Sequence, residues 1–203
     1  MYYSSPTNSG NENLTAESCV SYEIGTNLKL SAHKFNTAIF MRLEDQLIDW
    51  IYNPNNSIWY AQNISAAKTS GFEFGYQINP QFYSANIPLS NISINYTYLD
   101  RKFDAGDFIS KYVSNYLRHQ IITTVEHNLL TPKLKLSWYL RYTDRVNFDD
   151  YFLTDVKFSY LWQQFRFFMN ATNIFNKEYY EVQYIPMPGR WIKVGFSLNL
   201  GLH

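Results

Sequence analysis

The residues best suited to chemistry are the histidines and the single cysteine. The four histidines, His33, His119, His127 and His203, are far apart and do not share the spacing of metal ligands, so water-exposed positions are favoured over a metal site. Cys19 has no partner for an internal disulfide or for a thiolate metal site. No basic residue or histidine adjoins it, which favours a passive residue near the start of a strand over a reactive thiol.

Two pairs of adjacent carboxylates, Glu44-Asp45 and Asp149-Asp150, lie at the edges of expected loops. Their hard oxygen atoms suit calcium, although solvated loop residues are the commoner explanation. The sequence contains no glycine-rich phosphate loop, no His-Glu-x-x-His, no Gly-x-Ser-x-Gly and no pair of cysteines. We therefore predict no catalytic residues, no bound cofactor and no enzymatic activity.

Composition excludes several classes of protein. Lys plus Arg equals Asp plus Glu at 17 each, so no bulk charge favours nucleic acid as a partner. No apolar run approaches the ~20 residues of a membrane helix. Aromatic residues make up 19% of the chain, which is typical of a β-rich protein. The first residues lack a secretion signal, and for a membrane barrel this predicts that part of the protein precedes Met1.

Alternation of apolar with polar residues predicts an all-β chain of about nine strands, extending from about residue 20 to residue 200. Residues 1–19 carry no such period and are expected to form a loop. The expected strands span 22–30, 35–43, 59–79, 92–98, 116–129, 134–142, 152–160, 165–174 and 191–200.

The connections between these strands alternate in length. One set, at 31–34, 80–89, 130–132 and 161–164, is mostly brief, and the other, at 51–57, 101–115, 144–150 and 175–190, tends to be longer and more polar. Outer-membrane barrels show this asymmetry between their periplasmic turns and extracellular loops. Rings near strand ends suit the headgroup level, although cross-strand aromatic pairs explain them equally well. The four rings in question are Tyr98, Tyr142, Tyr160 and Trp191.

The last strand shows the alternation most clearly. Its apolar residues Ile192, Val194, Phe196 and Leu198 are interleaved with Lys193, Ser197 and Asn199. A strand of about ten residues can cross a bilayer at a tilt of ~45°. In a membrane barrel the apolar set would face lipid and the polar set the lumen.

Several segments of the sequence resemble a known family in their order along the chain. They are Leu14-Thr-Ala-Glu with Tyr22-Glu-Ile-Gly, Ala67-Lys-Thr-Ser-Gly-Phe-Glu, Asn95-Tyr-Thr-Tyr-Leu-Asp, Thr172-Asn-Ile-Phe-Asn-Lys-Glu-Tyr-Tyr and Pro188-Gly-Arg. Together they are similar to the C-terminal part of a TonB-dependent outer-membrane receptor, over nearly the whole chain. A narrower similarity, in Asp45-Gln-Leu-Ile-Asp-Trp, is to vitamin B12 receptors within that family.

The resemblance implies a location in the outer membrane and a role in nutrient uptake. The family's barrel has about twenty-two strands around an N-terminal plug. Residues 1–203 would then form the last nine strands, an up-and-down antiparallel meander that leaves the barrel open. The resemblance also implies the partners. The wall would contact the lipid of the outer membrane, and TonB would act through the plug, which these residues do not contain. The ligand of the complete receptor would be a small nutrient such as cobalamin, a siderophore or haem. The chain ends Gly-Leu-His, where such barrels usually end on an aromatic residue.

The longer loops hold the residues that we expect to contact a ligand above a complete barrel. These are Asp104, Asp107, Tyr179, Tyr180 and Tyr184. Two alternatives remain open at this point. One is a soluble β-sandwich that binds carbohydrate or peptide through exposed tyrosines, and the other is a small complete outer-membrane barrel.

Overall fold

The computed structural model describes residues 4–103, 109–110, 115–182 and 185–199, and strands dominate it. The helical structure in these residues is one 3-10 turn, η1 (Pro80–Phe82), capped by the side chain of Asn79. A search of the described residues finds no helix with the length and apolar character needed to span a membrane.

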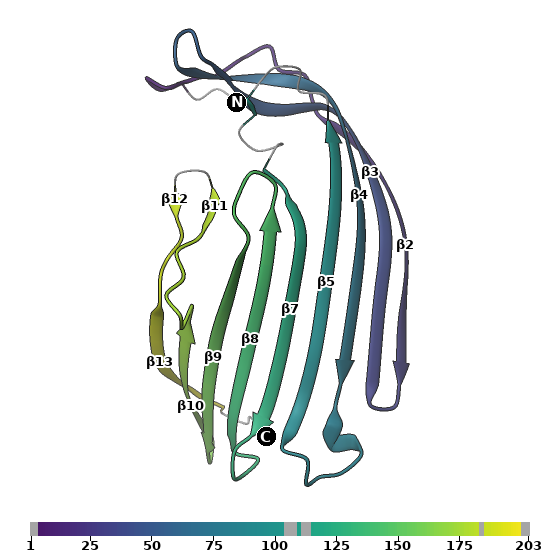
Figure 1. The fold of residues 1–203 in the computed structure, drawn as a ribbon, viewed down its shortest axis with the longest axis vertical. Helices are drawn as coiled ribbons and strands as arrows, with labels where there is room; N and C mark the ends of the chain where they lie inside the picture. The colour runs from purple at the N-terminus through teal and green to yellow at the C-terminus, as the bar shows by residue number, and fades with distance from the viewer. Residues whose placement is uncertain (1–3, 104–108, 111–114, 183–184, 200–203) are drawn as a thin grey trace.

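Nine strands follow one another across a single curved sheet, each antiparallel to its neighbours (Figure 1). They are β2 (Ser18–Leu30), β3 (His33–Asn53), β4 (Ile58–Ile78), β5 (Leu89–Phe103), β7 (Leu117–Asn128), β8 (Leu134–Arg145), β9 (Tyr151–Trp162), β10 (Phe165–Thr172) and β13 (Trp191–Leu198). Each corresponds to one of the strands expected from the alternation. The predicted all-β meander is therefore confirmed.

The sheet is open. Among the described residues β2 pairs only with β3, and β13 pairs only with β10, so both outer edges lack a strand partner. All residues of β2 are exposed because this edge strand has one neighbour. This arrangement contradicts the two packed sheets of a β-sandwich and the closed wall of a small complete barrel.

The register places apolar residues of successive strands in shared rows. Ile24 lies opposite Ile39, Ile39 opposite Phe72, and Phe72 opposite Tyr98. We call the side of the sheet that carries this row the apolar face. Its side chains stay exposed: Ile24 and Val194, at opposite edges of the sheet, are each 76% exposed. No second layer covers this face in the described part of the chain.

The other side, the polar face, carries the intervening residues of each strand. One of its rows joins Lys193, Asn170, Lys157, Ser137 and Glu126 through directly opposed pairs. The alternation predicted for the last strand is therefore confirmed as two chemically distinct sides of one sheet.

Strand β3 runs much further than the sequence predicted, whereas β4 matches its expected span of 59–79 closely. The predicted strand 35–43 lies within β3, but its end at residue 43 and the start of the loop at residue 51 are wrong, since β3 continues to Asn53 and only residues 54–57 turn the chain. The polar run Glu44-Asp45-Gln46 hid the continuation because it breaks the alternation. Gln46 adopts a positive φ of 56° inside the strand, while the pairing of β3 with β4 keeps one register on both sides of it. The long hairpin bends over at one end of the sheet (Figure 1).

Two short strands extend this bent hairpin. β1 (Asn8–Ser9) pairs in parallel with β4, and β6 (Ile109–Ser110) pairs with β3. They correct the expectation that 1–19 and 101–115 are entirely loops, as does the start of β2 at Ser18. A small apolar cluster of Ile51 and Ile64 holds the hairpin together, with Leu47 and Phe103 packed against it.

The connections gather at the two ends of the sheet in the two sets that the sequence predicted. One end, the turn end, has the connections 31–32, 79–88, 129–133 and 163–164, and the other, the loop end, has 54–57, 104–116, 146–150 and 173–190. The sets overlap in length, since 79–88 at the turn end is longer than 54–57 at the loop end. Within 173–190 the strands β11 (Tyr180–Val182) and β12 (Ile185–Pro186) pair as a separate hairpin, which the expectation of a loop over 175–190 missed.

Aromatic side chains gather at the turn end. The ring nitrogens of His33 are hydrogen-bonded to the hydroxyls of Tyr76 and Tyr83, at 2.8 and 2.6 Å. Two of the four rings predicted near strand ends are confirmed in that position, Tyr160 close to the end of β9 and Trp191 at the start of β13. The other two, Tyr98 and Tyr142, lie inside strands that are longer than expected.

Candidate ligand-binding site

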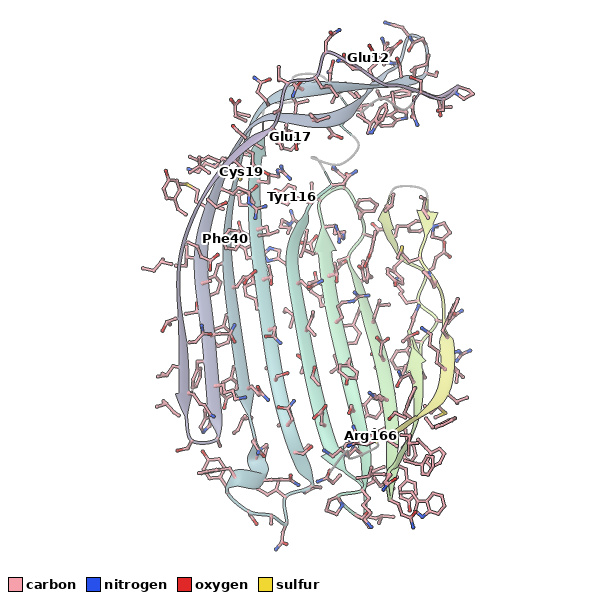
Figure 2. The ribbon with its side chains drawn as sticks, turned by 180° about the vertical axis from the view of Figure 1, so that it is seen from behind. Glu12, Glu17, Cys19, Phe40, Tyr116 and Arg166 are labelled. Atoms are coloured by element: carbon pink, nitrogen blue, oxygen red, sulfur yellow. The ribbon has the colours of Figure 1, made fainter. Side chains whose placement is uncertain are left out.

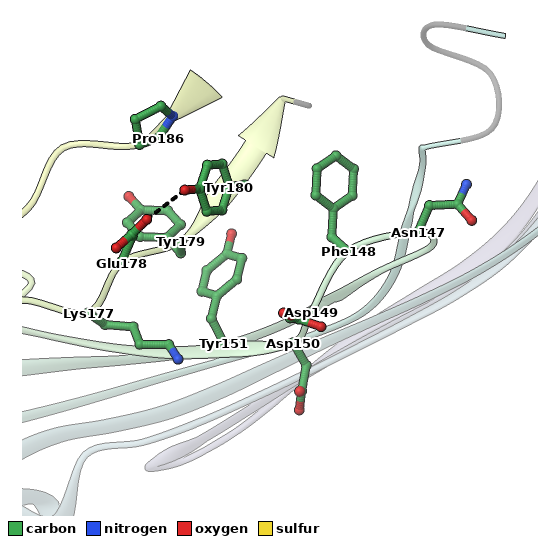
Figure 3. Close-up of a pocket in the computed structure, with 10 residues that line it drawn as sticks. All are labelled: Asn147, Phe148, Asp149, Asp150, Tyr151, Lys177, Glu178, Tyr179, Tyr180 and Pro186. Atoms are coloured by element: carbon green, nitrogen blue, oxygen red, sulfur yellow. Dashed lines mark hydrogen bonds between the residues drawn. The ribbon is translucent and has the colours of Figure 1, made fainter. Parts of the chain in front are cut away.

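A pocket of about 790 Å³ opens at the loop end of the sheet, between two consecutive loops (Figure 3). The loop between β8 and β9 contributes one wall, and the residues that lead into β11 and β12 contribute the other. Strands β8, β9, β10 and β13 are neighbours in the sheet, so these loops emerge side by side. The lining residues are Asn147, Phe148, Asp149, Asp150, Tyr151, Lys177, Glu178, Tyr179, Tyr180 and Pro186.

Asn173 positions the second wall. This side chain is only 4% exposed, and its amide group closes a tight turn. Its Nδ2 donates to the carbonyl of Lys177 at 2.8 Å, while its Oδ1 accepts from the backbone N–H of the same residue at 2.8 Å. Its own backbone N–H donates to Asp155 Oδ1 at 2.7 Å. The turn is thereby attached to strand β9, and Lys177 and Glu178 are held at the pocket.

A second contact closes the same loop from its other end. The backbone N–H of Arg190 donates to Asn176 Oδ1 at 2.8 Å, and the Arg190 guanidinium donates to the carbonyl of Ile174 at 3.3 Å. Asn173 and Asn176 both have positive φ, a conformation in which asparagine is strained less than most residues. The segments Thr172-Asn-Ile-Phe-Asn and Pro188-Gly-Arg are thus two sides of one structural unit.

Tyrosines join the two walls. The rings of Tyr151 and Tyr179 have centroids 4.6 Å apart and planes inclined by 41°. The Tyr151 hydroxyl donates to Glu181 Oε1 at 2.8 Å, and the Arg141 guanidinium lies 3.8 Å from the same oxygen. Strand β9, neighbouring β8 and the β11–β12 hairpin are therefore connected by a ring contact, a hydrogen bond and an ion pair.

Acidic groups dominate the charge of the pocket, with Asp149, Asp150 and Glu178 against Lys177. The Tyr180 hydroxyl donates to Glu178 Oε1 at 2.5 Å (Figure 3). This hydrogen bond, with the negative charge of Glu178, raises the pKa of Tyr180 above its ordinary value. The ordinary pKa of tyrosine already lies well above neutral pH, so the hydroxyl is protonated and the contact is present there. The raised pKa extends the contact to more alkaline conditions, and it is lost as the pH rises through that pKa.

The structure brings together part of the predicted ligand-contacting set. Tyr179 and Tyr180 line the pocket. Asp104, Asp107 and Tyr184 lie outside the described residues. Whether any of the five contacts a ligand stays a prediction.

The wall from the β8–β9 loop was not predicted as part of a site. From the sequence, Asp149 and Asp150 were expected to be solvated loop residues or calcium ligands, and Phe148 was not a candidate. On the second wall, Lys177 and Glu178 were not among the candidates either. The order of the strands could have indicated these residues. Loops 144–150 and 175–190 lie before and after the predicted hairpin of strands 152–160 and 165–174, so both loops must emerge at the same end of that hairpin.

The remaining candidates for chemistry lie apart from the pocket. His119 Nδ1 is hydrogen-bonded to the Tyr96 hydroxyl at 2.9 Å, and Glu44 is paired with Arg101 at 2.8 Å. Cys19 is exposed on edge strand β2 (Figure 2). The described residues contain no group of three or more His, Cys, Asp or Glu side chains that could hold a metal ion. His203 lies outside them.

Comparisons with known proteins place the fold. Residues 1–201 match the family model described as TonB dependent receptor-like, beta-barrel. The FrpB iron transporter of Neisseria meningitidis superposes with a TM-score of 0.70 at 17% identity, over 93% of this chain and 32% of its own. No curated protein matches.

Two other solved structures show the same relationship. The pyoverdine receptor FpvA of Pseudomonas aeruginosa, in a structure with pyoverdine bound, gives a TM-score of 0.66 at 16% identity, over 98% of this chain and 32% of its own. The copper transporter OprC gives 0.72 at 12% identity, over 94% and 34%. This chain thus spans about a third of the length of each receptor. The chain belongs to the TonB-dependent receptor family, and the part of the family that it matches is the β-barrel.

Proposed function

We propose that this chain forms part of the wall and part of the outer binding loops of an outer-membrane receptor for a scarce nutrient. The pocket between the β8–β9 loop and the β11–β12 hairpin carries the proposal, because it lies at the end of the sheet where the longer loops gather. Longer loops face the outside in outer-membrane barrels.

The two faces of the sheet suit opposite surroundings in this proposal. The apolar face, with exposed Ile24, Phe196 and Val194, would lie against lipid, where these side chains are stable. The polar face, with Lys157 and Lys193, would line the lumen. Nothing in this role requires a catalytic group.

A metal chelate is the ligand class that we favour. A volume of about 790 Å³ is in the usual range for binding small molecules, and the mixture of tyrosine rings and hydroxyls can contact both apolar and polar parts of such a ligand. The structural neighbours are named as iron, siderophore and copper proteins. Cobalamin, suggested by the resemblance to vitamin B12 receptors, stays a prediction.

Uptake of this kind would also require partners. A plug inside the barrel and TonB would couple transport to energy, and the polar face would contact the plug. These roles rest on family membership and on the fact that the chain spans about a third of its structural neighbours.

Uptake of radiolabelled ferric chelates by cells that express the receptor containing this chain tests the proposal. Tyr179→Ala should reduce uptake of the preferred chelate, because it removes a ring from the pocket wall. Tyr83→Ala, at the turn end, is the matched control and should leave uptake unchanged. Equal uptake by both variants and the parent would contradict a binding role for this pocket.

A further inference from the structure

The apolar face changes character along β4 and β5. The regular register between these strands places their side chains on this face in directly opposed pairs. From the turn end to the loop end the pairs are Ile78–Ile92, Tyr76–Ile94, Phe74–Tyr96, Phe72–Tyr98, Ser70–Asp100 and Lys68–Lys102. Apolar and aromatic rows thus give way to polar rows, which locates the upper boundary of the membrane-facing band on these strands.

Lys68 and Lys102 face each other directly at this boundary. Both are exposed, and none of the ion pairs found among the described residues includes either of them. Like charges directly opposite on neighbouring strands destabilise a sheet. Such a pair becomes favourable when an anion lies between the two ammonium groups.

The surroundings of the pair combine charge with apolar surface. Lys68 and Lys102 line an open groove of about 600 Å³ together with Val20 and Leu43, and the carboxylates Glu44 and Asp45 also line it. Glu44 is already paired with Arg101. Leu43 is directly opposite Lys68, and Val20 is directly opposite Leu43. One row across four neighbouring strands therefore carries Val20, Leu43, Lys68 and Lys102 in that order, two aliphatic side chains followed by two cations.

Two carboxylates lie in the rows above and below. Asp45 is opposite Ala66, one row toward the loop end, and Asp100 is opposite Ser70, one row toward the turn end. Neither is directly opposed to a lysine. They limit the positive potential to the single row of Lys68 and Lys102, which suits one anionic group.

We propose that Lys68 and Lys102 bind the phosphate of an anionic lipid headgroup in the leaflet at the loop end, with the lipid's acyl chain along Val20 and Leu43. Charge complementarity identifies the phosphate, and the boundary position of the row identifies a lipid as its source. This site is on the opposite face of the sheet from the lumen and is independent of the nutrient pocket.

Electron spin resonance of spin-labelled lipids in bilayers or micelles containing the 203-residue chain tests the site. We expect spin-labelled phosphatidic acid to associate with the chain more strongly than spin-labelled phosphatidylcholine. Each lysine near a membrane surface contributes about a fivefold preference for anionic lipid, so Lys68→Gln/Lys102→Gln should reduce the selectivity by roughly 25-fold. Lys68→Arg/Lys102→Arg should retain it, because the charge remains.

The chain supplies a matched control. Lys29 and Lys34 are also directly opposed and exposed, but they belong to the polar face. Lys29→Gln/Lys34→Gln should therefore leave the selectivity intact. Equal association of both lipids with the parent chain, or a loss in the control as large as in the site variant, would overturn the proposal. So would displacement of the labelled lipid by an equal concentration of inorganic phosphate, since that would identify a site for the free ion.

Discussion

Arg190 and Asn176 lie on opposite sides of the loop between β10 and β13, and a 2.8 Å hydrogen bond from the Arg190 backbone N–H to Asn176 Oδ1 joins them. The same oxygen explains the glycine between Pro188 and Arg190, because a Cβ at Gly189 would lie 2.6 Å from it. Two segments that contributed separately to the family resemblance are therefore parts of one contact. That contact places the β11–β12 hairpin over the end of the sheet.

Asn173→Ala should destabilise this loop. The substitution removes hydrogen bonds to both backbone groups of Lys177 from a side chain that is only 4% exposed. Leaving buried polar groups unpaired costs about 1–3 kcal/mol. Urea unfolding of the refolded chain measures the change. Asn86→Ala, at an exposed position in the turn end, should cost much less, and equal losses would show that Asn173 does not hold the loop.

Val194→Arg should impair insertion into bilayers far more than Ser197→Arg. Val194 is 76% exposed on the apolar face, whereas Ser197, further along the same strand, belongs to the polar face. A charge at mid-bilayer on the lipid side of a barrel costs about 2–4 kcal/mol, and a change in the lumen costs little. Refolding yield into vesicles measures the difference. Similar yields for the two variants would argue against a lipid-facing role for this side of the sheet.

Glu44→Ala should destabilise the sheet near the bend of the β3–β4 hairpin. Glu44 Oε2 accepts from the Arg101 guanidinium at 2.8 Å and from Thr69 Oγ1 at 3.3 Å, and both charged side chains are largely buried. Removing one partner of a buried ion pair costs about 3–5 kcal/mol because the other charge stays unpaired.

Thermal unfolding measures this loss. Glu44→Ala with Arg101→Leu should recover part of the stability, since the double variant leaves no charge unpaired. A double variant less stable than Glu44→Ala alone would contradict this explanation. Asp149→Ala, in the open pocket, serves as the control for the loss of an acidic residue.

The meander was predictable because alternation with a period of two survives in each strand, as in Phe72, Phe74 and Tyr76. The full length of β3 was not predictable, because the polar run Glu44-Asp45-Gln46 interrupts the alternation and looks like a loop. Strands β1 and β6 were too short to leave any pattern. Their pairing depends on the extended β3–β4 hairpin, which offers free backbone groups along both edges.

The site was only partly predictable for a different reason. Tyr179 and Tyr180 stand out by composition, whereas Asp149 and Asp150 look like any solvated loop pair. Their participation follows from the order of β8, β9, β10 and β13 in the sheet, which places two loops together. Which loop residues share a pocket is thus determined by the order of the strands in the sheet. It can be predicted only after the neighbouring strands have been assigned.

The isolated chain is expected to bind a ferric chelate weakly. The pocket of this chain has two walls, from adjacent loops, and each carries aromatic and acidic residues. The chain corresponds to about a third of each structural neighbour. The entropic cost of association is nearly independent of the number of contacts, so an incomplete set of loops leaves little net affinity. Isothermal titration calorimetry on the refolded 203 residues should show no tight binding of ferric chelates or of cobalamin. Tight binding by this chain would show that these loops form a self-sufficient site, and Tyr179→Ala would then locate it.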